Sequence, residues 1–96
     1  MKYYKIGDYL KFEIMEKFEV NQNMLAVALG VEQNRISEIV RGRRRITPNT
    51  DLRLCKYFGF KDGYFLDLQK NIELEQEHKN LGNELNKIIP LKTLKK

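Results

Sequence analysis

The stretch QNMLAVALGVEQNRISEI, residues 22–39, decides the fold predicted for this chain. Its first part reads as a helix over residues 22–29, because Asn21 is a good N-cap whose side chain accepts an otherwise unpaired backbone N–H group. Gly30 then ends this helix, since glycine adopts a left-handed conformation at little cost. A second helix follows at once, over residues 32–40. The stretch therefore predicts two short helices joined by a tight turn.

Small and apolar residues recur in this stretch where two tightly crossed helices need them. Ala26 is small where the second helix passes close to its Cβ, and Ile36 with Ile39 seats that second helix. The positions that match this spacing are Leu25, Ala26, Leu29, Gly30, Val31, Ile36 and Ile39. Each residue alone is common in a protein core, and an ordinary helical hairpin is the alternative. Together the residues predict a helix-turn-helix.

The segments on either side of the central stretch also have helical spacing. Leu10, Ile14 and Phe18 recur four residues apart and predict an amphipathic helix over residues 8–18, with Asp8 placed to cap it. No segment shows the alternation of a β-strand. The chain is therefore expected to be all-α, with five or six helices.

A further helix is expected to begin at Thr47, whose hydroxyl can cap it, followed by Pro48 in the first turn. It should run through Leu52 and Cys55 to Phe58. We expect Leu52 and Cys55 on its inward face. Cys55 is then better explained as a small buried hydrophobic residue than as a reactive thiol.

The last helical region is expected to begin at Asp62 and to continue to Pro90, which cannot extend a helix. Gly82 interrupts the pattern, so one long helix and two shorter ones both fit. The length suits one domain over residues 1–96, with residues 73–89 as a C-terminal helical extension.

Positive charge is concentrated directly behind the second helix of the central stretch. The formal net charge of the 96 residues is +5, but four arginines lie within residues 41–45, whereas residues 73–77 carry three glutamates. A local basic cluster indicates a polyanionic partner more strongly than net charge does. A nuclear-localisation segment or a general RNA-binding segment would look similar in isolation. The preceding helix-turn-helix favours double-stranded DNA.

Composition excludes several other classes of protein. A chain that is 42% hydrophobic and 32% charged is expected to be globular. One cysteine allows no internal disulfide, and no apolar run or leader pattern indicates a membrane, so we expect a cytoplasmic protein. One histidine cannot build a multi-histidine metal site, and no catalytic constellation is visible. We therefore expect a binding protein, with no cofactor, metal or small-molecule substrate, rather than an enzyme.

The exposed face of the second helix carries the side chains suited to reading DNA bases. Amides and guanidinium groups form specific hydrogen bonds with base edges in the major groove. The candidates for base contacts are Gln33, Asn34, Arg35 and Ser37. Arg35 lies at the edge of this face, so a phosphate contact is also open for it. Glu38 can accept from cytosine, but an ion pair with Arg41 or Arg35 is the preferred interpretation.

Phosphate contacts are expected from two other places. The first turn of the preceding helix presents amide side chains beside backbone N–H groups, and the arginine cluster leaves the second helix where the duplex backbone would run. The candidates for phosphate contacts are Gln22, Asn23, Arg41, Arg43, Arg44 and Arg45. A solvated helix start is the alternative for the two amides. One of the four arginines is expected to form a structural ion pair instead, with Asp51 as the suggested partner.

From about Gly7 to Ile88 the chain resembles the HigA-type antitoxins, a branch of the XRE/Cro-like helix-turn-helix family. The phrases that carry the resemblance are ALGVEQNRISEIVRGRRRITPNTDLRLCKYFG and FLDLQ. Two positions depart from the family pattern, which commonly has tryptophan where this chain has Phe65 and proline where it has Ile6. Neither departure touches the helix expected to face DNA.

The resemblance implies a lambda-repressor-like fold and two roles. Such proteins are typically homodimers that bind a palindromic operator and repress their own operon. They also hold a RelE- or HigB-like ribonuclease toxin in an inactive complex. A free-standing XRE-family regulator of phage or host genes, without a toxin, is the alternative that the sequence leaves open.

An apolar stripe near the C-terminus is the expected dimer contact. Its members step by three and four residues and are Leu74, His78, Leu81, Leu85 and Ile88. We expect this stripe to pack on the fifth helix and on a second copy of the chain. The glutamates at positions 73, 75 and 77 are the suggested contact for a basic toxin, although a solvated acidic face is the preferred interpretation.

Overall fold

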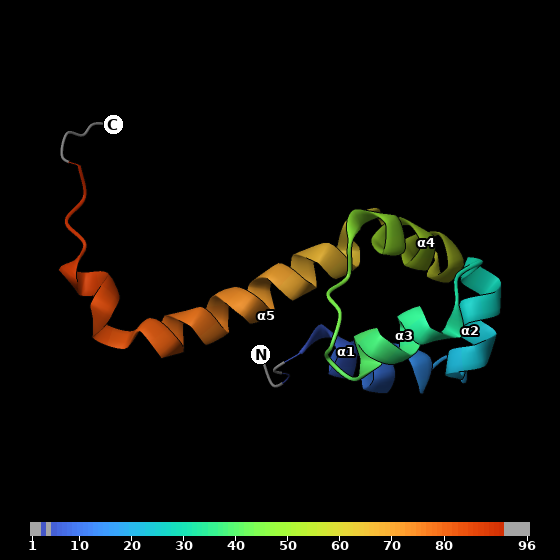
Figure 1. Ribbon diagram of the computed structural model, residues 1–96. Helices are drawn as coiled ribbons and strands as arrows, with labels where there is room; N and C mark the ends of the chain where they lie inside the picture. Colours follow the sequence, from blue (N-terminus) through green and yellow to red (C-terminus); the bar gives the residue numbers. More distant parts are fainter. Residues whose placement is uncertain (1–2, 4, 92–96) are drawn as a thin grey trace.

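The fold is described by a computed structural model that covers residue 3 and residues 5–91. The ends of the predicted domain, residues 1–2, 4 and 92–96, lie outside the described residues. Within the described part the elements, in order, are α1 (Ile6–Tyr9), η1 (Leu10–Met15), α2 (Gln22–Leu29), α3 (Gln33–Val40), α4 (Pro48–Phe58), α5 (Tyr64–Leu81) and η2 (Gly82–Lys87). The fold is all-α, as predicted. Figure 1 shows α5 extending away from the bundle formed by the other helices.

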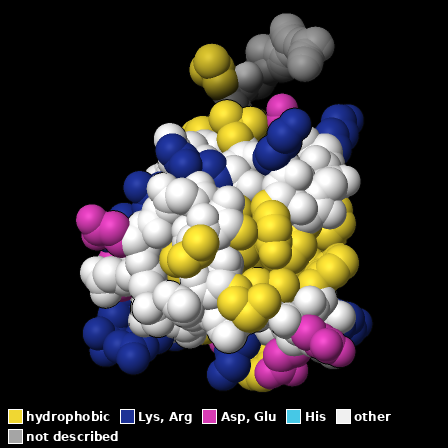
Figure 2. Space-filling model, turned by 90° about the vertical axis from the view of Figure 1, so that its right-hand side faces the viewer, with side chains coloured by type: hydrophobic (Ala, Val, Ile, Leu, Met, Phe, Trp, Pro, Cys, Tyr) yellow, Lys and Arg dark blue, Asp and Glu magenta, His cyan; other side chains and the backbone are white. Residues whose placement is uncertain are grey.

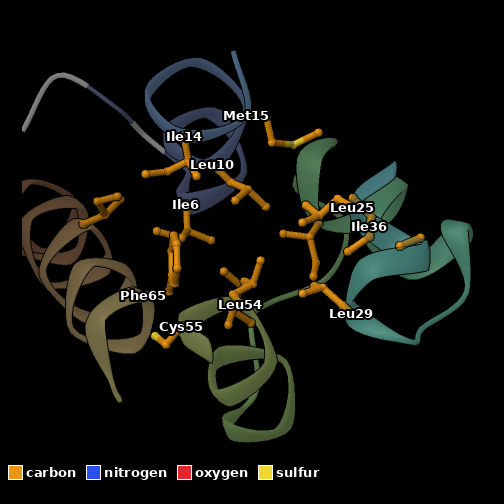
Figure 3. Close-up of a cluster of buried hydrophobic side chains, with 14 residues drawn as sticks. Ile6, Leu10, Ile14, Met15, Leu25, Leu29, Ile36, Leu54, Cys55 and Phe65 are labelled. Atoms are coloured by element: carbon orange, nitrogen blue, oxygen red, sulfur yellow. The ribbon is translucent and has the colours of Figure 1, made fainter. Parts of the chain in front are cut away.

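The core lies where the five α-helices and η1 converge. Figure 3 shows side chains from all of these elements pointing toward one another, with Leu10, Leu25, Ile36, Leu54 and Phe65 among them. Each of these five side chains is fully buried. Phe65, at the position where the HigA-type pattern commonly has tryptophan, is therefore a core residue. It joins the first turn of α5 to the bundle.

The central stretch forms the predicted pair of helices. The Asn21 side chain accepts the backbone N–H of Met24 at 2.8 Å, so it caps α2 as expected. Gly30 ends α2 with a φ of 72°, in the left-handed region where glycine is favoured. The N–H of Val31 donates to the carbonyl of Ala26 at 3.0 Å and closes the turn. The prediction of a helix-turn-helix is confirmed.

The first predicted helix, over residues 8–18, was wrong in its start and its winding. It begins at Ile6, Asp8 does not cap it, and its second part is the π-helix η1, in which the N–H of Glu16 donates to the carbonyl of Lys11 at 3.0 Å. A π-helix takes more residues per turn than an α-helix. Met15 therefore faces the core, and Phe18 is left 52% exposed.

Gly7 allows α1 to lie directly against the end of α3. A Cβ added at Gly7 would stand 2.0 Å from the carbonyl oxygen of Ile39 and 2.8 Å from that of Val40. Both distances are shorter than any van der Waals contact, so only glycine fits without moving a backbone. The contact fixes the C-terminal end of α3 relative to the N-terminal helix.

Helix α4 has the predicted ends but a different inward face. Thr47 accepts the N–H of Thr50 at 3.4 Å, and Gly59 ends the helix with a φ of 79°. Cys55 is buried, and its burial raises the pKa of its thiol. The prediction for Leu52 was wrong, because that side chain is 50% exposed. The inward stripe is formed instead by Asp51 and by Leu54 and Cys55, which follow it by three and four residues.

Asp51 joins α4 to α5 rather than pairing with an arginine, so the suggested ion pair was wrong. Its carboxylate is buried and accepts three backbone N–H groups: from Gly63 at 2.7 Å, from Phe65 at 3.0 Å and from Leu66 at 3.1 Å. These groups belong to the start of α5, where helical N–H groups have no partner within the helix. Asp51 therefore caps α5 from another helix.

Helix α5 begins at Tyr64, two residues after the predicted start at Asp62, and runs without interruption to Leu81. Gly82 then has a φ of 52°, and the chain continues as the short 3-10 helix η2. The region is thus one long helix followed by a change of direction. No helix within the described residues is both long and apolar enough to cross a membrane.

Replacing Asp51 with alanine should lower the free energy of unfolding by about 2–4 kcal/mol, because three N–H groups at the start of α5 would lose their acceptor. Urea denaturation followed by circular dichroism measures this loss. Asp67→Ala is the matched control, since Asp67 is exposed in the first turn of α5, and it should cost less than about 0.5 kcal/mol. Equal losses in both variants would contradict the capping role.

Candidate nucleic-acid interface

The outer face of α3 presents most of the predicted base-reading side chains. Ile36 and Ile39 are fully buried and hold the helix on the bundle, so the opposite face is free of the core. Gln33 and Asn34 are exposed in the first turn, and Ser37 is half-buried one turn later. These three side chains can donate and accept hydrogen bonds at a surface.

Arg35 differs from the other predicted base-reading residues because α4 holds it. It is half-buried, and its guanidinium donates to the side-chain oxygen of Asn49 at 3.1 Å and to that of Thr50 at 3.4 Å. Both partners lie in the first turn of α4. Arg35 therefore links α3 to α4, and its orientation is fixed before any ligand binds.

Glu38 pairs with Arg44, so both suggested partners, Arg41 and Arg35, were wrong. The Nη2 and Nε atoms of Arg44 lie 2.7 and 2.9 Å from the same carboxylate oxygen of Glu38. The amide of Asn34 also donates to Glu38, at 3.4 Å. The hydrogen bond from Arg44 is the main reason that the pKa of the Glu38 carboxyl is lowered from its usual range. A chain of contacts thus connects the arginine segment with the first turn of α3.

Arg45 is the arginine that forms the structural ion pair, but its partner is Glu73 and not Asp51. Its Nε and Nη2 atoms donate to the two carboxylate oxygens of Glu73 at 2.8 and 2.9 Å. This two-point contact raises the pKa of Arg45 and lowers the pKa of Glu73. It ties the arginine segment to α5.

The backbone of the same segment is held by a buried amide that the sequence did not reveal. The side chain of Gln69 in α5 accepts the N–H of Ile46 at 2.7 Å and donates to the carbonyl of Ile46 at 2.9 Å. Both residues are buried. Since Gln69 satisfies both polar groups of one residue, it fixes the chain where the arginine segment ends.

The four arginines are therefore of two kinds. Arg44 and Arg45 are held by carboxylates. Arg41 and Arg43 are exposed and have no ion-pair partner among residue 3 and residues 5–91. In the first turn of α2, Asn23 is exposed and Gln22 is half-buried, which leaves the predicted amide contacts at the surface.

The predicted apolar stripe lies on α5 and beyond it. Leu74, His78 and Leu81 are exposed on α5 itself, so the expected packing of the stripe against the fifth helix of the same copy was wrong. Leu85 lies in η2, and Ile88 follows it with 68% of its surface exposed. The stripe changes direction at Gly82 and leaves a large apolar surface in water.

The side chains that could bind a metal ion do not cluster in the described part of the chain. Among the described residues there is no group of three His, Cys, Asp or Glu side chains that could hold a metal ion. The surface around α3 therefore offers hydrogen-bonding and cationic groups held by a rigid scaffold. That combination defines a helix-turn-helix binding domain.

Comparison with known sequences gives the family. Residues 12–65 match the helix-turn-helix family. Virulence-associated protein I of Dichelobacter nodosus is 38% identical over 87 residues, which cover 91% of this chain and 80% of that protein. The uncharacterized HTH-type transcriptional regulator YbaQ of Escherichia coli is 31% identical over 78 residues, 81% of this chain and 69% of that protein. The chain belongs to the helix-turn-helix family.

Solved structures narrow this placement to the XRE-type proteins that resemble HigA. Pseudomonas aeruginosa antitoxin HigA with the higBA promoter superposes with a TM-score of 0.79 at 28% identity, covering 92% of this chain and 97% of that chain. A Pseudomonas aeruginosa protein in complex with 28 bp of its operator DNA superposes with a TM-score of 0.82 at 28% identity, covering 91% and 97%. The predicted resemblance to HigA-type antitoxins is confirmed. The family is one of DNA-binding regulators, and enzymes are not typical of it.

The pairing of Glu38 predicts a measurable change in its acidity. Replacing Arg44 with alanine should raise the pKa of Glu38 toward its usual range, whereas Arg41→Ala should leave it unchanged. NMR titration of the side-chain carboxyl measures both values. Because the native pKa is lowered, the pair stabilises the fold above the usual carboxyl pKa, and this contribution is lost as the pH falls through the native value. If Arg41→Ala raises the pKa of Glu38 and Arg44→Ala does not, the partner of Glu38 is Arg41, as the sequence suggested.

Proposed function

We propose that this chain is the antitoxin of a type II toxin–antitoxin system. As a homodimer it binds a palindromic operator, represses its own operon, and holds a RelE- or HigB-like ribonuclease toxin inactive. The observation that carries this proposal is the likeness, over nine-tenths of the chain, to a HigA antitoxin whose structure includes its promoter. The exposed polar face of α3 beside unpaired arginines supports the DNA-binding part.

In this proposal α3 enters the major groove as the recognition helix. Gln33, Asn34 and Ser37 contact base edges through amide and hydroxyl groups. Arg35 stands at the side of the groove in the orientation that α4 imposes on it. It contacts either a guanine or the backbone.

The DNA backbone is held on both sides of the recognition helix. Gln22 and Asn23 at the start of α2 contact one phosphate group, where backbone N–H groups also point outward. Arg41 and Arg43 neutralise phosphates at the other end. Arg44 and Arg45 lie beside them, and each is oriented by a carboxylate. They contribute positive electrostatic potential at a fixed position.

Dimerisation is assigned to the exposed stripe of α5 and η2, formed by Leu74, His78, Leu81, Leu85 and Ile88. Burying these side chains against a second copy removes apolar surface from water. A two-fold axis there presents two recognition helices, which must lie about 34 Å apart to enter successive major grooves on one face of the duplex.

Toxin binding is assigned to the acidic side chains of α5. Glu77 is exposed on α5 and offers negative charge to a basic ribonuclease. Glu73 is a weaker choice than the sequence suggested, because Arg45 already engages it. A free-standing regulator is the second candidate function, and the likeness to an HTH-type transcriptional regulator favours it.

The neighbouring gene separates these two functions. If a short basic reading frame lies beside this gene, its expression alone should arrest growth and its product should co-purify with this chain. Co-expression of this chain should restore growth. A neighbour that is harmless and does not bind would reject the antitoxin role and leave the free-standing regulator.

Base reading and phosphate binding predict different losses of affinity. Gln33→Ala or Asn34→Ala should weaken binding to the DNA upstream of this gene by about 1–3 kcal/mol and leave binding to a random duplex nearly unchanged. Arg43→Ala should weaken binding to both duplexes and reduce the slope of log K against log salt by about one. Fluorescence anisotropy at several salt concentrations measures all of these.

Lys70→Ala is the matched control for this series, because it removes one exposed positive charge from α5 that is not among the residues assigned to DNA contact. It should leave the slope unchanged. Equal losses on both duplexes for Gln33→Ala would count against base reading by that residue.

The dimer predicts a coupled loss of self-association and operator binding. Leu81→Asp or Leu85→Asp should shift the chain from dimer to monomer in sedimentation velocity at micromolar concentration, and operator affinity should fall with it. The helical content should be kept, because both side chains are outside the core. Asn80→Asp adds the same charge to the same helix outside the stripe and should change neither property. A monomeric wild type that binds a palindrome with full affinity would reject this dimer.

A further inference from the structure

A second apolar surface lies at the end of the bundle opposite to the free end of α5. Figure 2 looks onto this end and shows hydrophobic side chains gathered at its centre. Val27 on α2 is 74% exposed, and Leu52 on α4 is half exposed. We call this surface the distal patch; it consists of Phe18, Met24, Val27, Leu52 and Tyr57.

Three members of the distal patch, Phe18, Leu52 and Tyr57, are connected through α4. Leu52 and Tyr57 line a groove between α2 and α4, whose other wall includes Ala28. The ring of Phe58 lies 4.9 Å from that of Tyr57 and 5.2 Å from that of Phe18, measured between centroids. A contiguous exposed apolar surface of this kind marks an interaction site more often than isolated apolar residues do.

No residue assigned above to DNA, to the dimer or to the toxin belongs to the distal patch. The base-reading residues lie on α3, and the dimer stripe lies on α5 and η2, which leave the bundle at its other end (Figure 1). If two copies pair through the stripe, their distal patches point away from the two-fold axis. Each patch then remains open at an outer end of the dimer.

Opposite charges border the distal patch on two sides. Lys56 lies in the wall of the groove on α4, whereas Glu16 and Glu19 flank Phe18 in the segment after η1. Figure 2 shows charged side chains of both signs around the apolar centre, with acidic side chains together at its lower right. Within the described part of the chain, Glu16, Glu19 and Lys56 have no ion-pair partner. The unpaired charges at Glu19 and Lys56 are opposite, so the acidic edge of one copy can face the basic edge of another.

We propose that the distal patch binds the distal patch of a second copy of this chain. A two-fold axis between them sets the acidic edge around Glu19 on the basic edge around Lys56 of the other copy, and the apolar centres meet. An isologous contact of this kind uses one surface twice. A uniformly basic partner such as a ribonuclease would match the acidic edge but meet repulsion from Lys56.

The consequence on DNA rests on the proposed operator-binding dimer. Dimers joined end to end through their distal patches would occupy neighbouring operators together. Binding to one site then raises the effective concentration at the next. The contact itself requires neither DNA nor the stripe.

Charge exchange tests this contact in the full-length chain. Glu19→Lys places two positive charges against each other across the axis, and Lys56→Glu does the same with negative charges. Each variant should weaken the association step beyond the stripe dimer by about tenfold or more in sedimentation velocity. An equimolar mixture of the two variants should restore association, because each new charge then faces its opposite.

Two further variants complete the test. Val27→Asp should abolish the same step by placing a carboxylate at the apolar centre, and circular dichroism should show an unchanged fold. Asp67→Lys mixed with Lys70→Glu is the control, with the same charge changes on α5, and it should behave as the wild type does.

Two results would overturn the proposal: a mixture of Glu19→Lys and Lys56→Glu that associates no better than either alone, or patch variants that lose toxin binding while self-association stays intact. Failure of the proposed dimer looks different, since Leu81→Asp would then leave the wild-type association unchanged.

Discussion

The arrangement of the molecule depends on one buried carboxylate. Asp51 sits on α4, yet its oxygens accept the N–H groups at the start of α5. An unpaired carboxylate in this position would be costly, and unpaired N–H groups would be costly too, so each requires the other. The interaction sets the point from which α5 leaves the bundle. The direction of the C-terminal stripe relative to α3 follows from it.

Two other contacts make α5 part of the proposed DNA-binding unit. Gln69 holds the backbone of Ile46, and Glu73 holds the guanidinium of Arg45. The arginine segment is thus attached to α3 at one end and to α5 at the other. A change in the position of α5 would reach the arginines through side chains that span a single turn of that helix. Dimerisation and DNA contact share this element in our proposal.

The local features of the fold were predictable from the sequence, because they depend on neighbours along the chain. Asn21, Gly30, Thr47 and Gly59 mark helix ends by their own chemistry, and the structure confirms each of them. The misses involve partners distant in sequence or a change in winding. Nothing near Asp51 indicates that it caps a helix twelve residues later, and four similar arginines do not reveal which of them meets Glu38 or Glu73. The π-winding of η1 likewise has no local signal, although it decides that Phe18 faces outward and contributes to the distal patch.

The close contact at Gly7 has a consequence for how α3 meets a ligand. The last carbonyl groups of α3 rest on a bare Cα, with no side chain between the two backbones. The separation of α1 and α3 is therefore set by atoms that have no rotamers, and side-chain fluctuation cannot change it. Binding then loses little entropy to the ordering of the helix backbone, since only the outward side chains have to settle. The least chemically distinctive residue of the chain thus acts as a spacer of fixed thickness behind the surface that we propose reads DNA.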